Sequence, residues 1–125
     1  RDALISKILD IITNKYGLTI VNQPPHLIHL SRSRASLFYG EHEQKFFYPR
    51  LIGFMCSGPI MPLLLEGDDA ISRWRKMIGP SNRKKQLTQA KDSLRALYAE
   101  SDTRNAFHGS DSEATAHREI AFFFP

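Results

Sequence analysis

Helical and β-type segments alternate along the chain, and this alternation restricts the fold more than any other feature of the sequence. Leu4, Ile8 and Ile12 recur at helical spacing in the first stretch, and Gly17 suits the residue that follows such a helix. The other predicted helices are 34–42 (capped by Ser31 or Ser33), 46–58, 69–79 (capped by Asp68, closed by Gly79), 92–99 and 111–121. The predicted strands are 18–21, 26–30, 60–67 and 104–108. A polar, basic loop is predicted over 80–91. Interleaved helices and strands in one small domain predict an α/β or α+β sandwich.

Length and composition restrict the class of protein. The chain has 125 residues, of which 42% are hydrophobic and 24% charged, so a single globular domain is expected. Cys56 is the only cysteine, which excludes a disulfide framework. The apolar stretches are shorter than a membrane span requires, and the net charge of +4 favours anionic ligands that carry phosphate. Because the chain begins at Arg1 without an initiator methionine and ends on the apolar stretch 121–125, we expect it to be a segment of a longer protein.

A histidine stands in the stretch TRNAFHGSDS (103–112), where a predicted strand leads into a predicted helix. Gly109 permits a tight turn directly after His108. Ser110 and Glu113 fit the capping-box pattern S-x-x-E, so we expect a helix N-terminus close to the imidazole ring, where free N–H groups attract anions such as phosphate. Such a histidine can accept a phosphoryl group, and it can equally be a turn histidine beside a helix cap.

Two other chemistries fit this histidine poorly. A Ser-His-Asp triad is not expected, because Ser110 and Asp111 are too close in the sequence to flank the two ring nitrogens of His108. A zinc site is not expected, because no H-x-x-x-H motif or cysteine pair accompanies the histidine. The residues alone leave the phosphate-accepting and the structural interpretations open.

Longer motifs resemble one known family. The stretch TRNAFHGSDS followed by REIAFFFP resembles the active-site signature of nucleoside diphosphate kinases, N-x-x-H-G-S-D with E-I-x-x-F-F on the next helix. FYGEHEQKFFYPRLIGFMCSGPIMPLLLEG, RKMIGPSN and DSLRALY resemble further segments of that family, in its order and spacing. The match covers nearly the whole chain. The sequence of residues 38–51 and the insertion at 83–91 are most similar to the divergent type-6 nucleoside diphosphate kinases.

The resemblance implies a fold and a domain boundary. It implies a ferredoxin-like α+β sandwich, an antiparallel sheet with helices packed on it, formed by residues 1–125 as one domain. The family begins with a strand that carries I-K-P-D and ends with a C-terminal extension, and we expect both to lie outside this chain. We also expect residues 1–125 alone to have little kinase turnover. Asp102 stands where the family usually has an apolar residue against the base.

The resemblance also implies a reaction and its residues. These enzymes transfer the γ-phosphoryl group of a nucleoside triphosphate to a nucleoside diphosphate through a phosphohistidine, with Mg²⁺ bound to the nucleotide. Nucleoside di- and triphosphates are the expected partners, together with a homo-oligomer. Matched to this sequence, the catalytic roles are the nucleophile (His108), its tyrosine neighbour (Tyr39), and the glutamate with the serine it positions (Glu119, Ser110). The nucleotide-binding roles are two phosphate-binding arginines (Arg75, Arg95), a serine that keeps the hydroxyl of the family's usual threonine (Ser81), the stacking aromatic (Phe47), the sugar contact (Asn105) and an aspartate near the magnesium (Asp111).

Other interpretations remain beside this one. Phe47 is equally a core residue of an amphipathic helix, Arg75 can belong to a solvated helix face, and Tyr39 can serve packing alone. The alternative function is a kinase-like module with weak or no turnover that binds nucleotides or proteins. The basic triplet 83–85 is most simply an exposed loop, and neither nucleic acid nor a membrane is expected as a partner. An intracellular location, cytoplasmic or mitochondrial, is expected.

Overall fold

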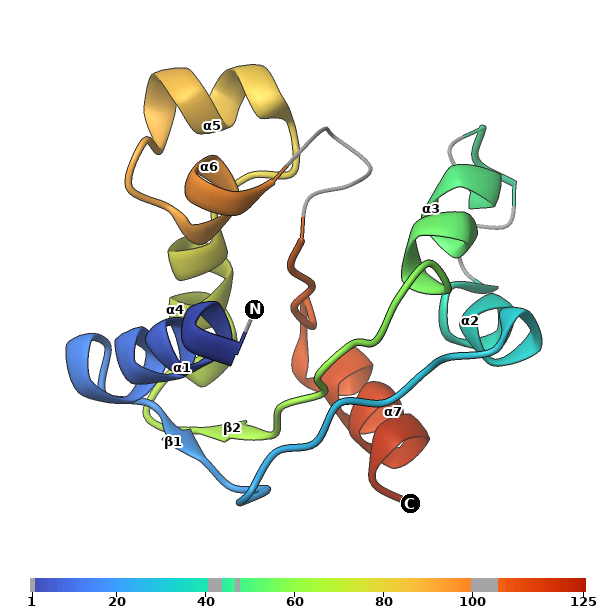
Figure 1. Ribbon diagram of the computed structural model, residues 1–125, viewed down its shortest axis with the longest axis horizontal. Coiled ribbons are helices and arrows are strands. Elements are labelled where there is room, and N and C mark those ends of the chain that lie inside the picture. Colours follow the sequence, from blue (N-terminus) through green and yellow to red (C-terminus); the bar gives the residue numbers. More distant parts are fainter. Residues whose placement is uncertain (1, 41–43, 47, 100–105) are drawn as a thin grey trace.

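The computed structural model describes residues 2–40, 44–46, 48–99 and 106–125, and within them a small antiparallel sheet lies at one edge of a group of helices (Figure 1). The elements are α1 (Asp2–Asp10), the π-helix η1 (Ile11–Lys15), β1 (Thr19–Ile20), α2 (Arg32–Phe38), α3 (Tyr48–Met55), β2 (Leu65–Glu66), α4 (Ala70–Ile78), α5 (Arg83–Gln89), α6 (Leu94–Tyr98) and α7 (Glu113–Phe123). This content confirms the predicted α+β class. No helix in the described part of the chain is long and apolar enough to cross a bilayer.

The sheet is shorter than the sequence predicts. β1 pairs with β2 in antiparallel register, with Ile20 opposite Leu65, and a separate bridge joins Ile28 to Ile60. Only two residues of the predicted strand 60–67 lie in β2, because Pro62 has no N–H to donate to a ladder. The side chain of Asn22 substitutes for the missing ladder: its amide donates to the Pro62 carbonyl (3.0 Å) and its oxygen accepts from the Leu64 N–H (2.8 Å).

Two apolar clusters hold the helices in place. The first joins η1, β1, α4 and α6 and consists of Ile12, Leu18, Ile20, Met77, Ile78 and Leu94, and the second joins α2 and α3 and consists of Leu30, Ala35, Phe38, Tyr39 and Ile52. Figure 1 shows α2 and α3 well apart from α4, α5 and α6, with the chain that leads into α7 running between the two groups. Phe107 packs against the first cluster, and the next ring along the chain, His108, contacts Phe38 of the second. The turn at His108 therefore lies where the two clusters meet.

The predicted loop over 80–91 is wrong in its middle, where the chain forms α5. Asn82 caps this helix by accepting from the Lys85 N–H (3.1 Å). The buried side of α5 is polar: Gln86 is fully buried and donates to the carbonyls of Pro80 (2.8 Å) and Ser81 (3.1 Å). A helix that packs through hydrogen bonds shows no apolar periodicity, so hydrophobic spacing could not reveal it.

Several helix ends confirm their predicted residues. Ser31 caps α2 by accepting from the Arg34 N–H. Gly17 follows the first helix with φ +70°, and Gly79 ends α4 with φ +82°; both are left-handed conformations that favour glycine.

Three other predictions at element ends are wrong. Asp69, not Asp68, precedes α4, and its left-handed backbone (φ 55°) leaves its side chain without a capping hydrogen bond. Ser112, not Ser110, caps α7 by accepting from the Thr115 N–H (3.1 Å), because Ser110 turns its hydroxyl toward Glu119. Residues 106–108, the described end of the predicted strand 104–108, lie in irregular backbone.

Candidate functional site

His108 is held by a carboxylate from the helix that follows it. Its Nε2 lies 3.1 Å from both carboxylate oxygens of Glu119, and the hydroxyl of Ser110 donates to Oε1 of the same carboxylate at 2.5 Å. Since an ionised carboxylate can only accept, Nε2 carries the proton and Nδ1 of the neutral ring carries the lone pair. Nδ1 has no hydrogen-bond partner among the described residues, and the side chain is 39% exposed. One nitrogen of the ring is therefore fixed by Glu119, and the other keeps its lone pair on a side chain that is partly exposed.

The Glu119 carboxylate is charged although it is buried. Its side chain is only 7% exposed. Burial by itself raises the pKa of this carboxyl, but the hydrogen bonds from His108 and Ser110 and the charge of Arg118 outweigh burial and lower the pKa below 4.5. Arg118 places its guanidinium 3.6 Å from Oε2 and donates to the Phe38 carbonyl (3.4 Å). The site thus keeps a negative charge directly behind the imidazole.

This lowered pKa predicts how stability depends on pH. Because the folded-state pKa of Glu119 lies below its unfolded value of 4.5, the carboxylate stabilises the fold above that value, and the contribution is lost as the pH falls through the folded-state pKa. We expect the free energy of unfolding of Glu119→Gln to fall less than that of the wild type between about pH 5 and pH 3. Urea unfolding at several pH values measures this, with Glu113→Gln, an exposed glutamate of the same helix, as the matched control. An equal decline in wild type and Glu119→Gln would contradict the assignment.

Two aromatic rings, at the end of α2 and directly after it, pack against the imidazole. Phe38 and Tyr39 meet the His108 ring edge-on, with centroids 5.1 and 5.8 Å away. Tyr39 is 5% exposed, and burial, together with the negative charge of Glu119, raises the pKa of its hydroxyl, which Arg95 partly opposes. Tyr39 is therefore a neutral phenol beside the histidine, as its predicted place in the site requires.

The two predicted phosphate ligands lie together next to the His108 turn. Arg95 donates to the carbonyls of Gly79 (2.9 Å) and Phe107 (2.8 Å), and Arg75 donates to the Gly109 carbonyl (3.2 Å). Burial and the neighbouring charge of Arg75 lower the pKa of Arg95, and its Nε is buried without a hydrogen-bond partner in the described part of the chain. Two close guanidiniums with donors to spare favour a polyanion in front of them.

Of the remaining predicted residues, the structure describes Ser81 and Asp111. Ser81 is exposed at the turn before α5, and Asp111 is exposed at the start of α7. A hydrogen bond from Thr115 and the charge of Arg75 lower the pKa of Asp111, which keeps it ionised. Phe47, Asn105 and the variant position Asp102 lie outside the described residues.

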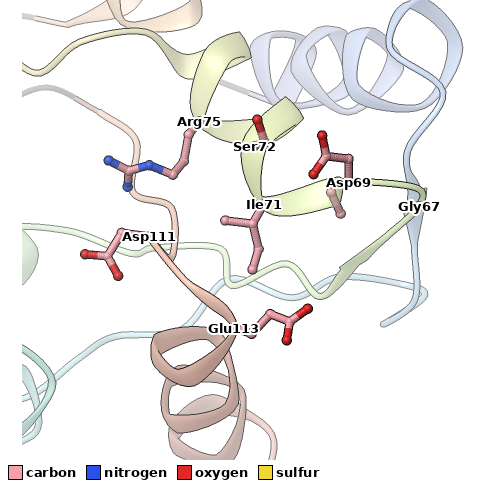
Figure 2. Close-up of a pocket in the computed structure, with 8 residues that line it drawn as sticks. Gly67, Asp69, Ile71, Ser72, Arg75, Asp111 and Glu113 are labelled. Atoms are coloured by element: carbon pink, nitrogen blue, oxygen red, sulfur yellow. The ribbon is translucent and has the colours of Figure 1, made fainter.

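An open cavity of about 640 Å³ lies beside this cluster, between the β2–α4 turn and the beginning of α7. Figure 2 shows the Arg75 guanidinium and the Asp111 carboxylate on one side of it, and Asp69 and Glu113 on the other. The lining residues are Gly67, Asp69, Ala70, Ile71, Ser72, Arg75, Asp111 and Glu113. The cavity therefore shares Arg75 and Asp111 with the cluster described above, and His108 does not line it.

Three side chains of the site were not predicted from the sequence. Trp74 donates its indole N–H to the His108 carbonyl (2.9 Å), Phe38 packs on the ring, and Arg118 contacts Glu119. Each directly precedes a residue that the motifs single out, namely Arg75, Tyr39 and Glu119. Their position next to a motif residue was the only indication in the sequence. It does not show whether the preceding or the following neighbour of a motif residue faces the site.

Comparison with known proteins agrees over the whole chain. A family model described as nucleoside diphosphate kinase matches residues 1–125. The probable nucleoside diphosphate kinase 5 of Arabidopsis thaliana is 42% identical over 108 residues, which are 86% of this chain and 74% of that relative. The solved nucleoside diphosphate kinase of Aquifex aeolicus is 35% identical, with a TM-score of 0.89 over 99% of this chain and 86% of the other. That of Halobacterium salinarum, solved in complex with CDP, is 31% identical, with a TM-score of 0.83 over 97% of this chain and 77% of the other.

These likenesses confirm the predicted ferredoxin-like α+β fold and the predicted family, while the resemblance to the type-6 enzymes stays a prediction. At more than 30% identity over most of both chains, the similarity extends beyond fold to common descent. The chain belongs to the nucleoside diphosphate kinase family.

Proposed function

We propose that this chain is a nucleoside diphosphate kinase that transfers the γ-phosphoryl group of a nucleoside triphosphate, with ATP as donor, to a nucleoside diphosphate by way of phosphorylated His108. One observation carries the proposal: Nε2 of His108 is fixed by both oxygens of Glu119 at 3.1 Å, and Nδ1 is left with its lone pair. A nucleophile held in one tautomer and one orientation is what covalent catalysis needs. The intact set of His108, Glu119 and Ser110 favours this function over a module without turnover.

The reaction balances without an external base. Nδ1 attacks the γ-phosphorus, the N–P bond forms, and the bond from that phosphorus to the bridging oxygen breaks, so that the diphosphate leaves with the electron pair. The ring gains positive charge as the N–P bond forms and retains the proton on Nε2. The buried Glu119 carboxylate stabilises that charge. Ser110 fixes the carboxylate. The second half of the cycle reverses these steps on another nucleoside diphosphate.

The remaining roles concern binding. Arg75 and Arg95 neutralise the phosphates, and Ser81 and Tyr39 supply hydroxyls. Phe47 and Asn105, both outside the described residues, contact base and sugar as the family resemblance implies. The described residues contain no group of three side chains able to hold a metal, so the isolated carboxylate of Asp111 fits a Mg²⁺ ion that arrives on the nucleotide. Bound there, Mg²⁺ would neutralise charge on the phosphates. We further propose one domain over residues 1–125 and a homo-oligomeric assembly.

Labelling with γ-³²P-ATP and Mg²⁺ tests the function. The expected product is a protein label that is labile in acid and stable in alkali, as a phosphoramidate is, and that passes to added GDP or CDP. A label that survives acid, as a serine or threonine phosphate would, overturns the phosphohistidine intermediate. A label that forms but does not pass to any diphosphate overturns the kinase activity.

Removing a residue that binds phosphate is expected to weaken the binding of every nucleotide by a similar factor. Arg75→Gln should raise the dissociation constants of ADP, GDP and CDP by a similar factor of about 10 to 100, because a hydrogen bond to a charged group contributes about 1.5–3 kcal/mol. Calorimetric titration with the three nucleotides measures this. Lys76→Gln, which removes an exposed charge from the next position of α4, is the matched control and should leave all three constants unchanged. An Arg75→Gln protein that binds one of the three nucleotides normally would rule out a role at the phosphates.

A further inference from the structure

Three consecutive carbonyls around the histidine accept hydrogen bonds from side chains rather than from backbone. The Phe107 carbonyl accepts from Arg95 (2.8 Å), the His108 carbonyl from Trp74 (2.9 Å) and the Gly109 carbonyl from Arg75 (3.2 Å). The segment needs such donors because residues 106–109 lie in neither helix nor strand, and Ala106 has the uncommon φ of +71°. The orientation of the histidine therefore depends on these three side chains.

Trp74 packs against both sides of the turn. Its ring meets Phe107 edge-on with centroids 6.3 Å apart, and it packs against the apolar cluster that joins η1, β1, α4 and α6. It also lies directly against Gly109, where a Cβ atom would approach its Cδ1 to 2.5 Å. Only glycine allows that approach, so the indole N–H reaches the carbonyl of His108 across the turn without displacing it.

The three donors differ in what else attracts them. Arg75 and Arg95 are cations, and the phosphates of a nucleotide compete for the same N–H groups that hold the turn. The indole has a single N–H, no charge and no acceptor, so phosphate gains little from it. Of the three hydrogen bonds to the turn, phosphate therefore competes least for the one from Trp74.

We propose that Trp74 is a positioning residue that holds the backbone of His108 throughout the catalytic cycle, while Arg75 and Arg95 exchange contacts with the turn for contacts with phosphate. The inference rests on the proposed function and goes beyond it, because it assigns the orientation of the nucleophile to an uncharged residue on a different helix. Trp74 acts through His108 and does not touch the reacting atoms.

The single tryptophan of the chain permits an isosteric test. Expression in a tryptophan auxotroph with β-(3-benzothienyl)alanine replaces the indole N–H by sulfur at Trp74 and alters no other residue, and 5-fluorotryptophan, which keeps the N–H, is the matched control. We expect the benzothienyl protein to form phosphohistidine about 3- to 10-fold more slowly in a single turnover, the effect of one lost hydrogen bond. The final amount of phosphohistidine and the ATP concentration for half-maximal rate should match the control, because folding and nucleotide binding are unchanged.

A merely structural tryptophan gives a different result. Loss of packing lowers the amount of active protein and therefore the final phosphohistidine, and it leaves the rate constant of the molecules that remain active unchanged. Equal rate constants in the benzothienyl and fluorotryptophan proteins would overturn the proposal. If the control forms no phosphohistidine at all, the proposed function fails.

A second measurement decides the hydrogen bond independently of activity. In protein labelled with ¹⁵N-tryptophan, the indole gives one proton–nitrogen cross-peak, and we expect the exchange rate of this N–H with solvent to be the same with and without saturating ADP. Fast exchange once ADP is bound would show that the nucleotide releases Trp74 and would overturn its role as the permanent contact.

Discussion

Replacing His108 by alanine should lower phosphoryl transfer from ATP to nucleoside diphosphates by at least about 1,000-fold, which corresponds to more than about 4 kcal/mol of activation free energy. The reason is that Nδ1 of this ring supplies the only nucleophile of the proposed reaction, and neither Ser110 nor Tyr39 can replace it. Ser110 is already hydrogen-bonded to Glu119, and the phenol of Tyr39 is buried with a raised pKa. A steady-state assay with ATP and a second nucleoside diphosphate measures the loss.

The chain offers a matched control in His117, an exposed histidine on α7. His117→Ala should transfer phosphate at the wild-type rate and take up the same acid-labile label. Retention of more than about a tenth of the activity by His108→Ala would mean that another group attacks the phosphorus. Loss of activity in His117→Ala would point instead to a general effect on α7.

Replacing Arg95 by methionine should damage both the stability and the activity of the protein. The guanidinium joins the carbonyls of Gly79 and Phe107, and methionine retains the apolar stem without any donor. Two unpaired carbonyls at about 1 kcal/mol each should lower the melting temperature by roughly 5–10 °C. Turnover should fall about 100-fold or more, because the developing charge on the phosphates loses a cation at the same time. Circular dichroism melting and the transfer assay at a temperature below both transitions measure the two effects.

Arg95→Lys separates the two roles of this residue. An ammonium group retains the positive charge but cannot span the two carbonyls as the planar guanidinium does, so we expect activity to recover more than stability. Arg32→Met, at an exposed position of α2, is the control for loss of an arginine in general. An Arg95→Met protein with normal turnover and a normal melting temperature would contradict the arrangement described here.

Arg95 and Glu119 place charges of opposite sign near the histidine. Its guanidinium is partly buried next to a second cation, and burial together with that cation lowers its pKa. The same region contains the buried carboxylate of Glu119, whose pKa is lowered by its hydrogen bonds in spite of burial. Arg95 stays charged in spite of these effects, because the ordinary pKa of a guanidinium lies far above neutrality. Fixed charges of both signs therefore lie close to the histidine, as preorganised stabilisation of phosphoryl transfer requires.

Predictions from the sequence succeeded where a short motif carries the geometry. The family resemblance paired Glu119 with Ser110, and the structure shows a hydrogen bond between these two side chains, with Nε2 of His108 3.1 Å from the same carboxylate. The prediction that Ser110 caps α7 is wrong, although Ser110 and Glu113 match the capping pattern S-x-x-E. Ser112 caps the helix, and Ser110 donates its hydrogen bond to Glu119. Two serines within three residues compete for the cap, and the position of the buried carboxylate decides between them.

The predictions failed where stabilising contacts are polar or come from distant segments. Helix α5 is secured by Gln86 and Arg83, whose hydrogen bonds to backbone carbonyls produce no pattern of apolar residues. The strand predicted over 60–67 is interrupted by Pro62, and the side chain of Asn22, about forty residues earlier, takes over its hydrogen bonding. Such pairs depend on which segments meet in the fold, and local propensity contains no information about that.

The sequence by itself predicted the α+β class and, through its resemblance to known proteins, the family, and both are confirmed. The same resemblance proposed His108, Glu119 and Ser110 as site residues, and the structure shows these three side chains in contact. The tertiary structure alone decided how that histidine is oriented. Trp74 and Arg75 on α4 and Arg95 on α6 converge on the carbonyls of residues 107–109, which are distant from them in the chain. The physical reason is that a turn without ladder or helix bonds must satisfy its carbonyls with donors from elsewhere, and only the packing of the two apolar clusters around it determines which side chains are within reach.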